Sequence, residues 1–439
     1  MSIKKLFILL FVILSHACRQ AGAVEGSTLL NPKPTFAQEI DNQPQVLIIN
    51  QVRGTECCEP GSLENLKQQI EILNKYDLPA FFTLRYDVLN NPDFIDYLNN
   101  IPDFSSPYLE RTSGELPPKA ERDQIGEVGQ GAEVKRLGLF IEITPQLATD
   151  AGVEYLGDEN TWYEAQHAYT IGYSPEDRLK LVDQLFKIFK AKFGYYPEIT
   201  TGWMLDTPTL NYIHEKYGIK VHQITREQWG TDSYTLYGGP PHYPYPASEN
   251  WLFMSDHQRQ NAPLIVRQTL TDPLYNYGDM SSSFTSQPND YMQDGKDIEY
   301  FKNLVNQALF DQPNKQTGFT LLGLENSMEK KYQEEYFKQL KFISSLSNIN
   351  IVSDLEKFNN IYKDSKINIY YGKDIINKGT NNTQTQVYWI SSPNYRIRLK
   401  FEGKEAYISD YRIINAKLKD PYTRLKAENQ GYWITPFII

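Results

Sequence analysis

The sequence lacks clusters of basic residues and, beyond its first residues, long apolar segments. Lysine and arginine never occur in runs longer than two, and the formal net charge is −10. Because phosphate binding needs clustered Lys and Arg, we expect no nucleic-acid partner. After residue 23 no stretch approaches the length needed to span a bilayer, so we expect no membrane span in the mature protein.

Cysteine is scarce, with three residues in 439. Two of them, Cys57 and Cys58, are adjacent and could close only a strained ring with each other. A vicinal disulfide, two free thiols and a bond to another chain all remain open. Zinc binding is disfavoured because no further Cys or His stands at the required spacing.

The N-terminal residues have the pattern of a secretory signal peptide. Two lysines precede an apolar run at 6–14, and Ala-Gly-Ala at 21–23 provides a cleavage site. We therefore expect residues 1–23 to be a signal peptide and the protein to be secreted, periplasmic or at the cell surface. Cys18 lies in a poor match to a lipobox, so a lipid anchor there is the alternative.

Aromatic residues are abundant, with 31 Tyr, 21 Phe and 6 Trp. A tyrosine ring is apolar and its hydroxyl is polar, which suits surfaces that stack on sugars and hydrogen-bond to them. The alternative is a compositional habit of an AT-rich genome. The hydrophobic content of 40% and charged content of 22% are ordinary for a globular protein with a large core.

Short apolar strands alternate with amphipathic helices over residues 45–363, after a polar linker at 24–44. The best-marked helix begins at Ser174-Pro175 and ends at Gly194. This alternation predicts an α/β fold with a parallel sheet, and seven units predict a seven-stranded β/α barrel. A doubly wound open sheet is the alternative. The expected strands are 46–49, 80–84, 137–143, 199–204, 219–224, 264–270 and 319–324.

After about residue 364 the pattern changes to short strands without helices between them. These strands are expected at 367–370, 386–390, 395–401 and 407–414. We predict a C-terminal all-β, sandwich-like domain over 364–439. The apolar residues 433–439 have the character of a strand, which either completes this domain or continues in a longer chain.

Charged and aromatic residues follow the ends of the predicted strands. In a parallel barrel the functional groups gather past the carboxyl ends of the strands, and charges there are costly unless paired or used. A structural ion pair or simple loop packing is the alternative for each residue taken singly. The expected site comprises the carboxylates Glu142 and Asp206 and the substrate-binding residues Arg53, Arg85, Asp87, Trp203, Asp232, Tyr234, Tyr245 and Glu325.

Four short motifs carry a resemblance to a known superfamily. They are Gln51–Gly54 with Glu56–Cys58, Arg85–Asp87, Gly202–Asp206 and Leu324–Asn326. From residue 46 to about 362 the sequence resembles the glycoside hydrolase/deacetylase β/α-barrel superfamily, which includes NodB-type polysaccharide deacetylases and family 57 glycoside hydrolases. Within it, the motifs resemble an uncharacterised bacterial branch. The resemblance implies a barrel, usually of seven strands, that acts on carbohydrate.

The resemblance to deacetylases implies a metal held by one Asp and two His, but the required residues are incomplete here. The Asp position holds Asn50, and the His-x-x-x-His position holds His167 followed by Ile171. We therefore predict neither a metal nor another cofactor. A site rebuilt with His242 or His257 is the alternative, although nothing in their spacing supports it.

The resemblance to family 57 implies a retaining mechanism in which Glu142 is the nucleophile and Asp206 the acid/base. We predict an exported hydrolase of a polysaccharide or other glycan. A non-catalytic glycan-binding barrel and a deacetylase with a rebuilt metal site remain open. The hydrolase requires the two carboxylates about 5–10 Å apart across a cleft, whereas the binding barrel predicts separated carboxylates held in salt bridges.

Overall fold

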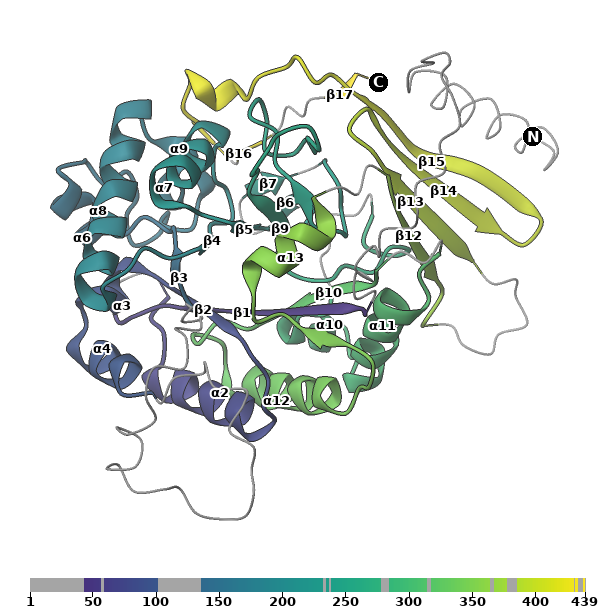
Figure 1. Cartoon of the computed structure of the whole chain (residues 1–439), viewed down its shortest axis with the longest axis horizontal. Coiled ribbons are helices and arrows are strands. Elements are labelled where there is room, and N and C mark those ends of the chain that lie inside the picture. Colours follow the sequence, from purple (N-terminus) through teal and green to yellow (C-terminus); the bar gives the residue numbers. More distant parts are fainter. Residues whose placement is uncertain are drawn as a thin grey trace, which may run out of the picture.

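A computed structural model of the chain shows a curled sheet surrounded by helices, with a second sheet at its side (Figure 1). It describes residues 43–56, 59–101, 136–231, 234–236, 238–277, 284–313, 317–363, 367–376, 385–429, 431–432 and 437–438. The expected signal peptide, the expected linker up to residue 42, and Cys57 and Cys58 lie outside these residues.

The central sheet contains all seven expected strands, and every ladder between neighbours among them is parallel. Their order is β10-β1-β2-β3-β4-β5-β9. The bounds are β1 (Gln45–Val52), β2 (Phe81–Leu84), β3 (Leu137–Phe140), β4 (Ile199–Thr201), β5 (Val221–Ile224), β9 (Leu264–Arg267) and β10 (Phe319–Leu322).

The sheet has nine strands rather than the seven expected. The additional strands are β8 (Tyr245–Pro246), antiparallel to β9, and β11 (Asn350–Ile351), parallel to β1. Each has two residues, too few to show a period in the sequence. In the described part of the chain no ladder joins β9 to β10, so the sheet curls without closing there by strand pairing.

Helices follow most strands, and their ends carry the expected signals. The Ser174 hydroxyl accepts a hydrogen bond from the Asp177 amide (3.2 Å), and Gly194 ends the helix at φ 79°. The helices are α2 (Leu63–Lys75), α3 (Tyr86–Asn90), α4 (Pro92–Asn99), α6 (Pro145–Ala151), α7 (Ala165–Ala168), α8 (Pro175–Phe193), α9 (Thr207–Tyr217), α10 (Pro288–Gln293), α11 (Ile298–Phe310), α12 (Lys330–Ser344) and α13 (Leu355–Tyr362), with 3-10 turns η1 (Thr170–Gly172) and η2 (Pro421–Thr423).

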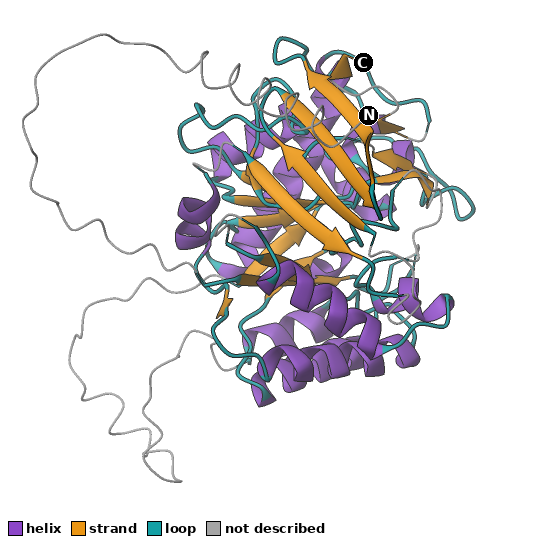
Figure 2. Cartoon of the chain, turned by 90° about the vertical axis from the view of Figure 1, so that its right-hand side faces the viewer, coloured by secondary structure: helices purple, strands orange, loops and turns teal. Residues whose placement is uncertain are grey.

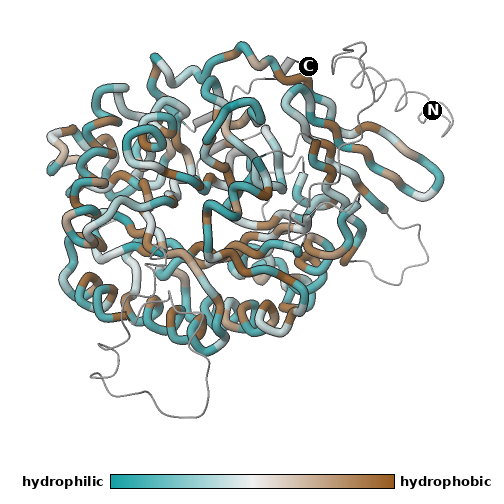
Figure 3. The backbone as a smooth tube through the Cα atoms, viewed as in Figure 1, coloured by the Kyte–Doolittle hydropathy of each residue, from teal (hydrophilic) through white to brown (hydrophobic). Residues whose placement is uncertain are grey.

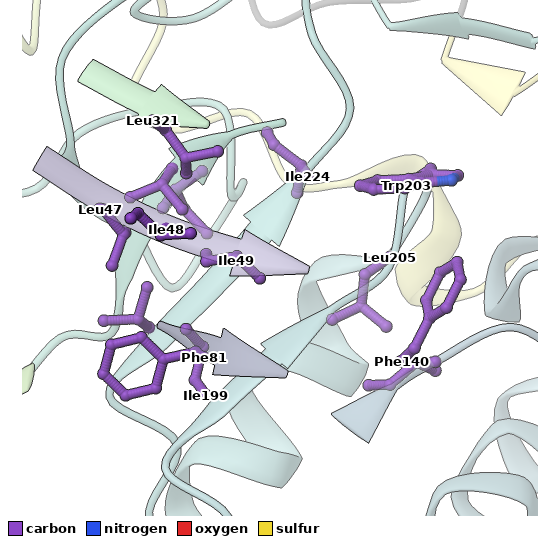
Figure 4. Close-up of a cluster of buried hydrophobic side chains, with 14 of the residues drawn as sticks. Leu47, Ile48, Ile49, Phe81, Phe140, Ile199, Trp203, Leu205, Ile224 and Leu321 are labelled. Carbon is purple, nitrogen blue, oxygen red and sulfur yellow. The ribbon is translucent and has the colours of Figure 1, made fainter. Parts of the chain in front are cut away.

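The core lies along the central strands, where many of the most hydrophobic residues are concentrated (Figure 3). All eight residues of β1 are buried, as a strand covered on both faces requires. Figure 4 shows the aliphatic side chains of β1 beside Phe81 and Ile199, with Phe140 and Trp203 near the arrowhead end. The rings of Phe140 and Trp203 lie 5.4 Å apart. Aromatic packing therefore marks the carboxyl end of the sheet.

The C-terminal part forms one antiparallel sheet, as Figure 2 shows. Its strands are β12 (Asn368–Lys373), β13 (Gln386–Ser391), β14 (Tyr395–Glu402), β15 (Glu405–Ile414) and β17 (Phe437–Ile438), in that order. The expected all-β character is present, but the described residues form a single sheet rather than a sandwich. One face packs on the barrel, where the Trp389 indole donates to the Pro273 carbonyl (3.0 Å). The barrel thus takes the place of a second sheet.

The segment after β15 returns to the barrel. The Ala427 amide donates to the Ile171 carbonyl (2.7 Å), and the Asp420 carboxylate accepts from the Thr207 amide (2.9 Å). Further on, β16 (Gly431–Tyr432) pairs in parallel with β7 (Tyr234–Leu236), which pairs with β6 (Gln228–Thr231). These contacts join the C-terminal segment to loops at the carboxyl end of the barrel.

Candidate active site at the carboxyl end of the barrel

A pocket of about 510 Å³ opens beyond the carboxyl ends of the parallel strands; we call it the rim pocket. The chain reaches it directly after β1, β4, β5, β9 and β10, because the carboxyl ends of parallel strands meet at one edge of a barrel. Its lining comprises Arg53, Glu59, Trp162, Tyr163, Tyr169, Trp203, Arg226, Gln268, Gln287, Asn289, Asp290, Gln293, Glu325 and Met328.

Arg53, the first residue after β1, organises one wall of the rim pocket. Its side chain is buried, and Nη1 donates to Glu59 (2.5 Å) and to Glu325. The loop that follows closes tightly, since the Gly61 amide donates to the Gly54 carbonyl (2.6 Å). A Cβ at Gly61 would lie 1.9 Å from the Arg53 carbonyl oxygen. Only glycine therefore fits where the chain brings Glu59 to Arg53.

Glu142 lies beneath Arg53 and is shared by two guanidinium groups. It accepts from Arg53 Nη2 (2.8 Å) and Arg85 Nη1 (2.6 Å), and Arg85 makes two bonds of 2.9 Å to Asp87. Burial alone would raise the pKa of Glu142, but the two arginines outweigh it and hold that pKa below its ordinary value. The pKa of Asp87 is lowered for the same reason, against burial, by Arg85. The alternating charges of Asp87, Arg85 and Glu142 thus hold the Arg53 guanidinium in place.

Glu325 behaves differently, although it also contacts Arg53. Burial raises the pKa of Glu325 to about 7; Arg53 opposes this rise and the charge of Glu59 adds to it. Glu59 and Glu325 also share the Ser327 hydroxyl, at 3.0 and 3.4 Å. The rim pocket therefore holds two adjacent carboxyl groups, and the pKa of one of them, Glu325, is raised to about 7.

Asp206 lies at the end of its strand region, where its side chain caps a helix. It is fully buried, accepts from the Thr209 amide (2.9 Å) as the N-cap of α9, and accepts from the Thr170 hydroxyl (2.7 Å). Arg178 Nη1 stands 3.4 Å from it. Neither Asp206 nor Glu142 is among the residues that line the rim pocket. Both are held in ion pairs, as the non-catalytic alternative predicts.

The other expected site residues fall into three groups. Trp203 and Glu325 line the rim pocket together with Arg53, while Arg85 and Asp87 lie behind Arg53. Tyr245 is buried on β8, and its hydroxyl donates to the Leu252 carbonyl (3.0 Å). Asp232 lies outside the described residues, and of Tyr234 only the backbone is described, within β7.

Several residues of the rim pocket were missed in the sequence. Arg226 follows β5 by two residues, so the rule that site residues follow strand ends would have found it. Its partner Asp290 (2.8 Å) comes from α10, after a loop without strand signals. Trp162 and Tyr163 come from the turn before α7, with ring centroids 5.8 Å apart. No strand pattern leads to these three residues.

The positions of the deacetylase metal ligands do not fit a metal. The Asn50 side-chain oxygen accepts from the Leu324 amide (3.1 Å) and the Tyr336 hydroxyl (2.8 Å). His167 Nδ1 lies 2.8 Å from the Thr161 carbonyl oxygen, and Ile171 is buried. Within the described residues, no group of three or more His, Cys, Asp or Glu could hold a metal ion.

The two histidines considered for a rebuilt site lie apart from the rim pocket. His242 is buried and stacks on Tyr370, with ring centroids 4.1 Å apart. His257 Nδ1 lies 2.8 Å from the Lys363 carbonyl oxygen. Each ring therefore has a contact that explains its position in the fold.

Comparison with known proteins supports the fold only. No family model matches the sequence, and no curated protein matches it. Among solved structures, the chain is similar to a "putative glycoside hydrolase/deacetylase" from Parabacteroides distasonis, with 12% identity and a TM-score of 0.57 over 90% of this chain and 89% of that one. The likeness agrees with the expected superfamily at the level of the fold and does not select a narrower branch. No helix in the described ranges is long and apolar enough to cross a membrane.

Proposed function

We propose that the protein is an exported hydrolase of a polysaccharide or other glycan, with Glu325 and Glu59 as its paired carboxylates. The observation that carries this proposal is their position together on the rim pocket, with the pKa of Glu325 raised by burial to about 7. A carboxyl group that keeps its proton near neutral pH can protonate a leaving oxygen. A neighbouring carboxylate can act as nucleophile or base.

The spacing of the two carboxyl groups favours retention of the anomeric configuration. Both accept from the same nitrogen, Arg53 Nη1. The Glu59 bond is 2.5 Å and a second bond of ordinary length is about 3 Å, so the bonded oxygens are at most about 5.5 Å apart. Retaining enzymes separate their carboxyl groups by about 5–5.5 Å and inverting enzymes by about 6.5–9.5 Å.

The proposed reaction has two steps. Glu325 gives its proton to the glycosidic oxygen while Glu59 attacks the anomeric carbon, so that the glycosidic bond breaks and a glycosyl ester forms. Glu325 then takes a proton from water, whose oxygen attacks the same carbon and releases Glu59. Arg53 stabilises the charge of Glu59 in both steps, and Glu142 holds Arg53 in place.

The lining of the rim pocket supports a sugar as substrate. The lining includes aromatic rings of Trp162, Tyr163, Tyr169 and Trp203, the last two almost fully buried, and amide side chains of Gln268, Gln287, Asn289 and Gln293. Such rings stack on the apolar faces of sugars, and amides bond to hydroxyl groups. The similar Parabacteroides distasonis protein is described as a "putative glycoside hydrolase/deacetylase", which agrees with a carbohydrate substrate.

The test is product release from bacterial and plant glycans, with and without a chelator, by wild type and variants. We expect sugar release that survives the chelator and falls at least about 100-fold in Glu325→Gln and Glu59→Gln. The matched control is Glu334→Gln, an exposed change on α12. Acetate release that the chelator abolishes would instead establish a deacetylase.

Two further variants separate this assignment from the one implied by the resemblance. Under the proposal, Asp206→Asn and Glu142→Gln act through stability and the position of Arg53. If Asp206→Asn folded normally and lost all activity while Glu325→Gln stayed active, the acid/base would be Asp206. Glycan binding without any product would support the non-catalytic barrel, which the ion pairs of Glu142 and Asp206 favour.

A further inference from the structure

The carboxyl groups that line the rim pocket outnumber its guanidinium groups. Three carboxyl groups, Glu59, Asp290 and Glu325, face it with two guanidinium groups, Arg53 and Arg226. Both arginines are buried, with exposed fractions of 3% and 4%. Because they already bond to these carboxylates, an acidic sugar entering the pocket would have to compete for them.

The layer beneath the pocket adds to this imbalance. Arg85 is the cation there, and it faces two carboxylates, Glu142 and Asp87. Over both layers five carboxyl groups oppose three guanidinium groups, and an excess of one negative charge remains when Glu325 holds its proton. Arg53 Nη2 is held by Glu142, and its Nε is closed off from solvent. A partly enclosed site with low-dielectric walls concentrates such a field, so the pocket attracts cations and repels anions.

The aromatic wall is a second and independent feature that suits a cation. Tyr163 is 43% exposed and meets Trp162 edge to face, with centroids 5.8 Å apart. Trp203 and Tyr169 also line the pocket but are buried, so Trp162 and Tyr163 provide most of the accessible aromatic surface. The face of an aromatic ring attracts an ammonium group and packs equally well on the C–H groups of a sugar ring. Carboxylates beside aromatic faces form a suitable environment for a positively charged sugar.

We propose that the rim pocket selects glycans with a free amino group, that is, unsubstituted hexosamine units, and discriminates against uronic acids. This inference rests on the proposed function only in taking the rim pocket as the place where the glycan binds. It adds a prediction about the charge of the substrate. The proposed hydrolysis does not depend on that charge.

The experiment measures binding of three thio-linked tetrasaccharides to the wild-type protein by calorimetry. Sulfur in place of the glycosidic oxygen keeps them from being cleaved. The probes are built from glucosamine, N-acetylglucosamine and galacturonic acid. We expect the glucosamine probe to bind at least about tenfold more tightly than the galacturonate probe, with a difference that shrinks in high salt.

Glu59→Gln sharpens the test, because the Glu59 side chain is 36% exposed and its loss is tolerated better than that of a buried group. It should weaken glucosamine binding about 3- to 10-fold and leave the N-acetylglucosamine probe within about twofold. Glu334→Gln should change neither. Equal affinity for all three probes, a preference for galacturonate, or no binding of the glucosamine probe would each overturn the inference.

The two proposals can fail separately. Selective binding of the glucosamine probe without hydrolysis of any glycan would remove the proposed function and leave the selectivity. Hydrolysis of neutral or acidic glycans, without preferential binding of the glucosamine probe, would support the proposed function and remove the selectivity.

Discussion

Two of the buried arginine–carboxylate networks among the described residues differ in what surrounds them. The pocket network joins Arg53 and Arg85 to Glu142 and opens onto the rim pocket of about 510 Å³. The junction network lies between the barrel and the C-terminal sheet, where Arg396 pairs with Glu227 (2.7 Å) and Asp410 (2.9 Å). Cavities beside the junction measure only about 10 Å³.

The pKa values of one buried acid from each network, Asp410 and Glu325, shift in opposite directions. At the junction, Arg396 and Arg412 overcome burial and lower the pKa of Asp410, and the Arg396 guanidinium lies 5.0 Å from the centre of the Trp389 ring. At the pocket, more carboxyl groups than cations are present, and the pKa of Glu325 rises to about 7. Paired arginines therefore lower the pKa of a buried acid at the junction, whereas burial, with the charge of Glu59, raises the pKa of Glu325 at the pocket.

Arg396→Met should have the largest effect on stability. It leaves Glu227 and Asp410 buried without their shared cation, which costs about 3–5 kcal/mol. Urea unfolding measures this loss, with the exposed change Lys426→Met as control. A loss below about 1 kcal/mol would mean that the junction network does not hold the sheet on the barrel.

Glu142→Gln should destabilise the protein less, by about 2 kcal/mol, because each arginine keeps another carboxylate. Arg53 retains Glu59 and Glu325, and Arg85 retains Asp87. We also expect kcat to fall about tenfold or more, because Arg53 loses the ion pair with Glu142 that positions it. An unchanged kcat in the folded variant would show that Glu142 does not position Arg53 for catalysis.

The free energy of unfolding should depend on pH through Glu325, a residue of the rim pocket. Its pKa is about 7 in the folded protein against an ordinary value of 4.5. The native state thus holds this proton after the unfolded state has lost it. The contribution is present in full below about pH 4.5 and is lost as pH rises to about 7, at up to about 1.4 kcal/mol per pH unit.

Two measurements follow from this sign. Wild type should lose more stability than Glu325→Gln between about pH 4.5 and 7. Wild-type kcat/KM should fall above about pH 7, as the general acid loses its proton. Identical stability profiles for the two proteins would contradict the protonated carboxyl group at this position.

Asp272→Asn should have the smallest effect. Burial raises the pKa of Asp272 to about 6 beside the junction, where it accepts from the Leu274 (2.9 Å) and Tyr275 (3.2 Å) amides. An amide oxygen can accept both bonds, so we expect less than about 1 kcal/mol and the same pH profile of activity as wild type. A shifted profile would mean that a raised pKa away from the rim pocket also governs activity.

Much of the fold was predictable because its signals are local. The seven parallel strands are short apolar runs, and the ends of α8 carry their own cap residues. The two-residue strands β8 and β11 could not be found, because they form only where a neighbouring strand offers a partner. The single sheet in place of a sandwich likewise depends on the barrel surface that its Trp389 face meets.

The candidate site was predictable in part. The rule that site residues follow strand ends located Arg53, Trp203 and Glu325. It also selected Asp206, whose position before Thr207-Pro208 is itself the signature of a helix N-cap. That local pattern favours a structural role. Asp290 and Trp162 come from loops, where sequence spacing does not indicate distance in space.

The sequence by itself determined the order of the seven expected strands, the caps of the best-marked helices, and several of the charged residues near the carboxyl end of the sheet. These depend on periods of a few residues and on caps. Only the tertiary structure decided which carboxyl group meets which arginine and which keeps its proton. Burial and pairing are properties of the whole packed molecule, because residues as distant as Arg53 and Glu325 set each other's charge.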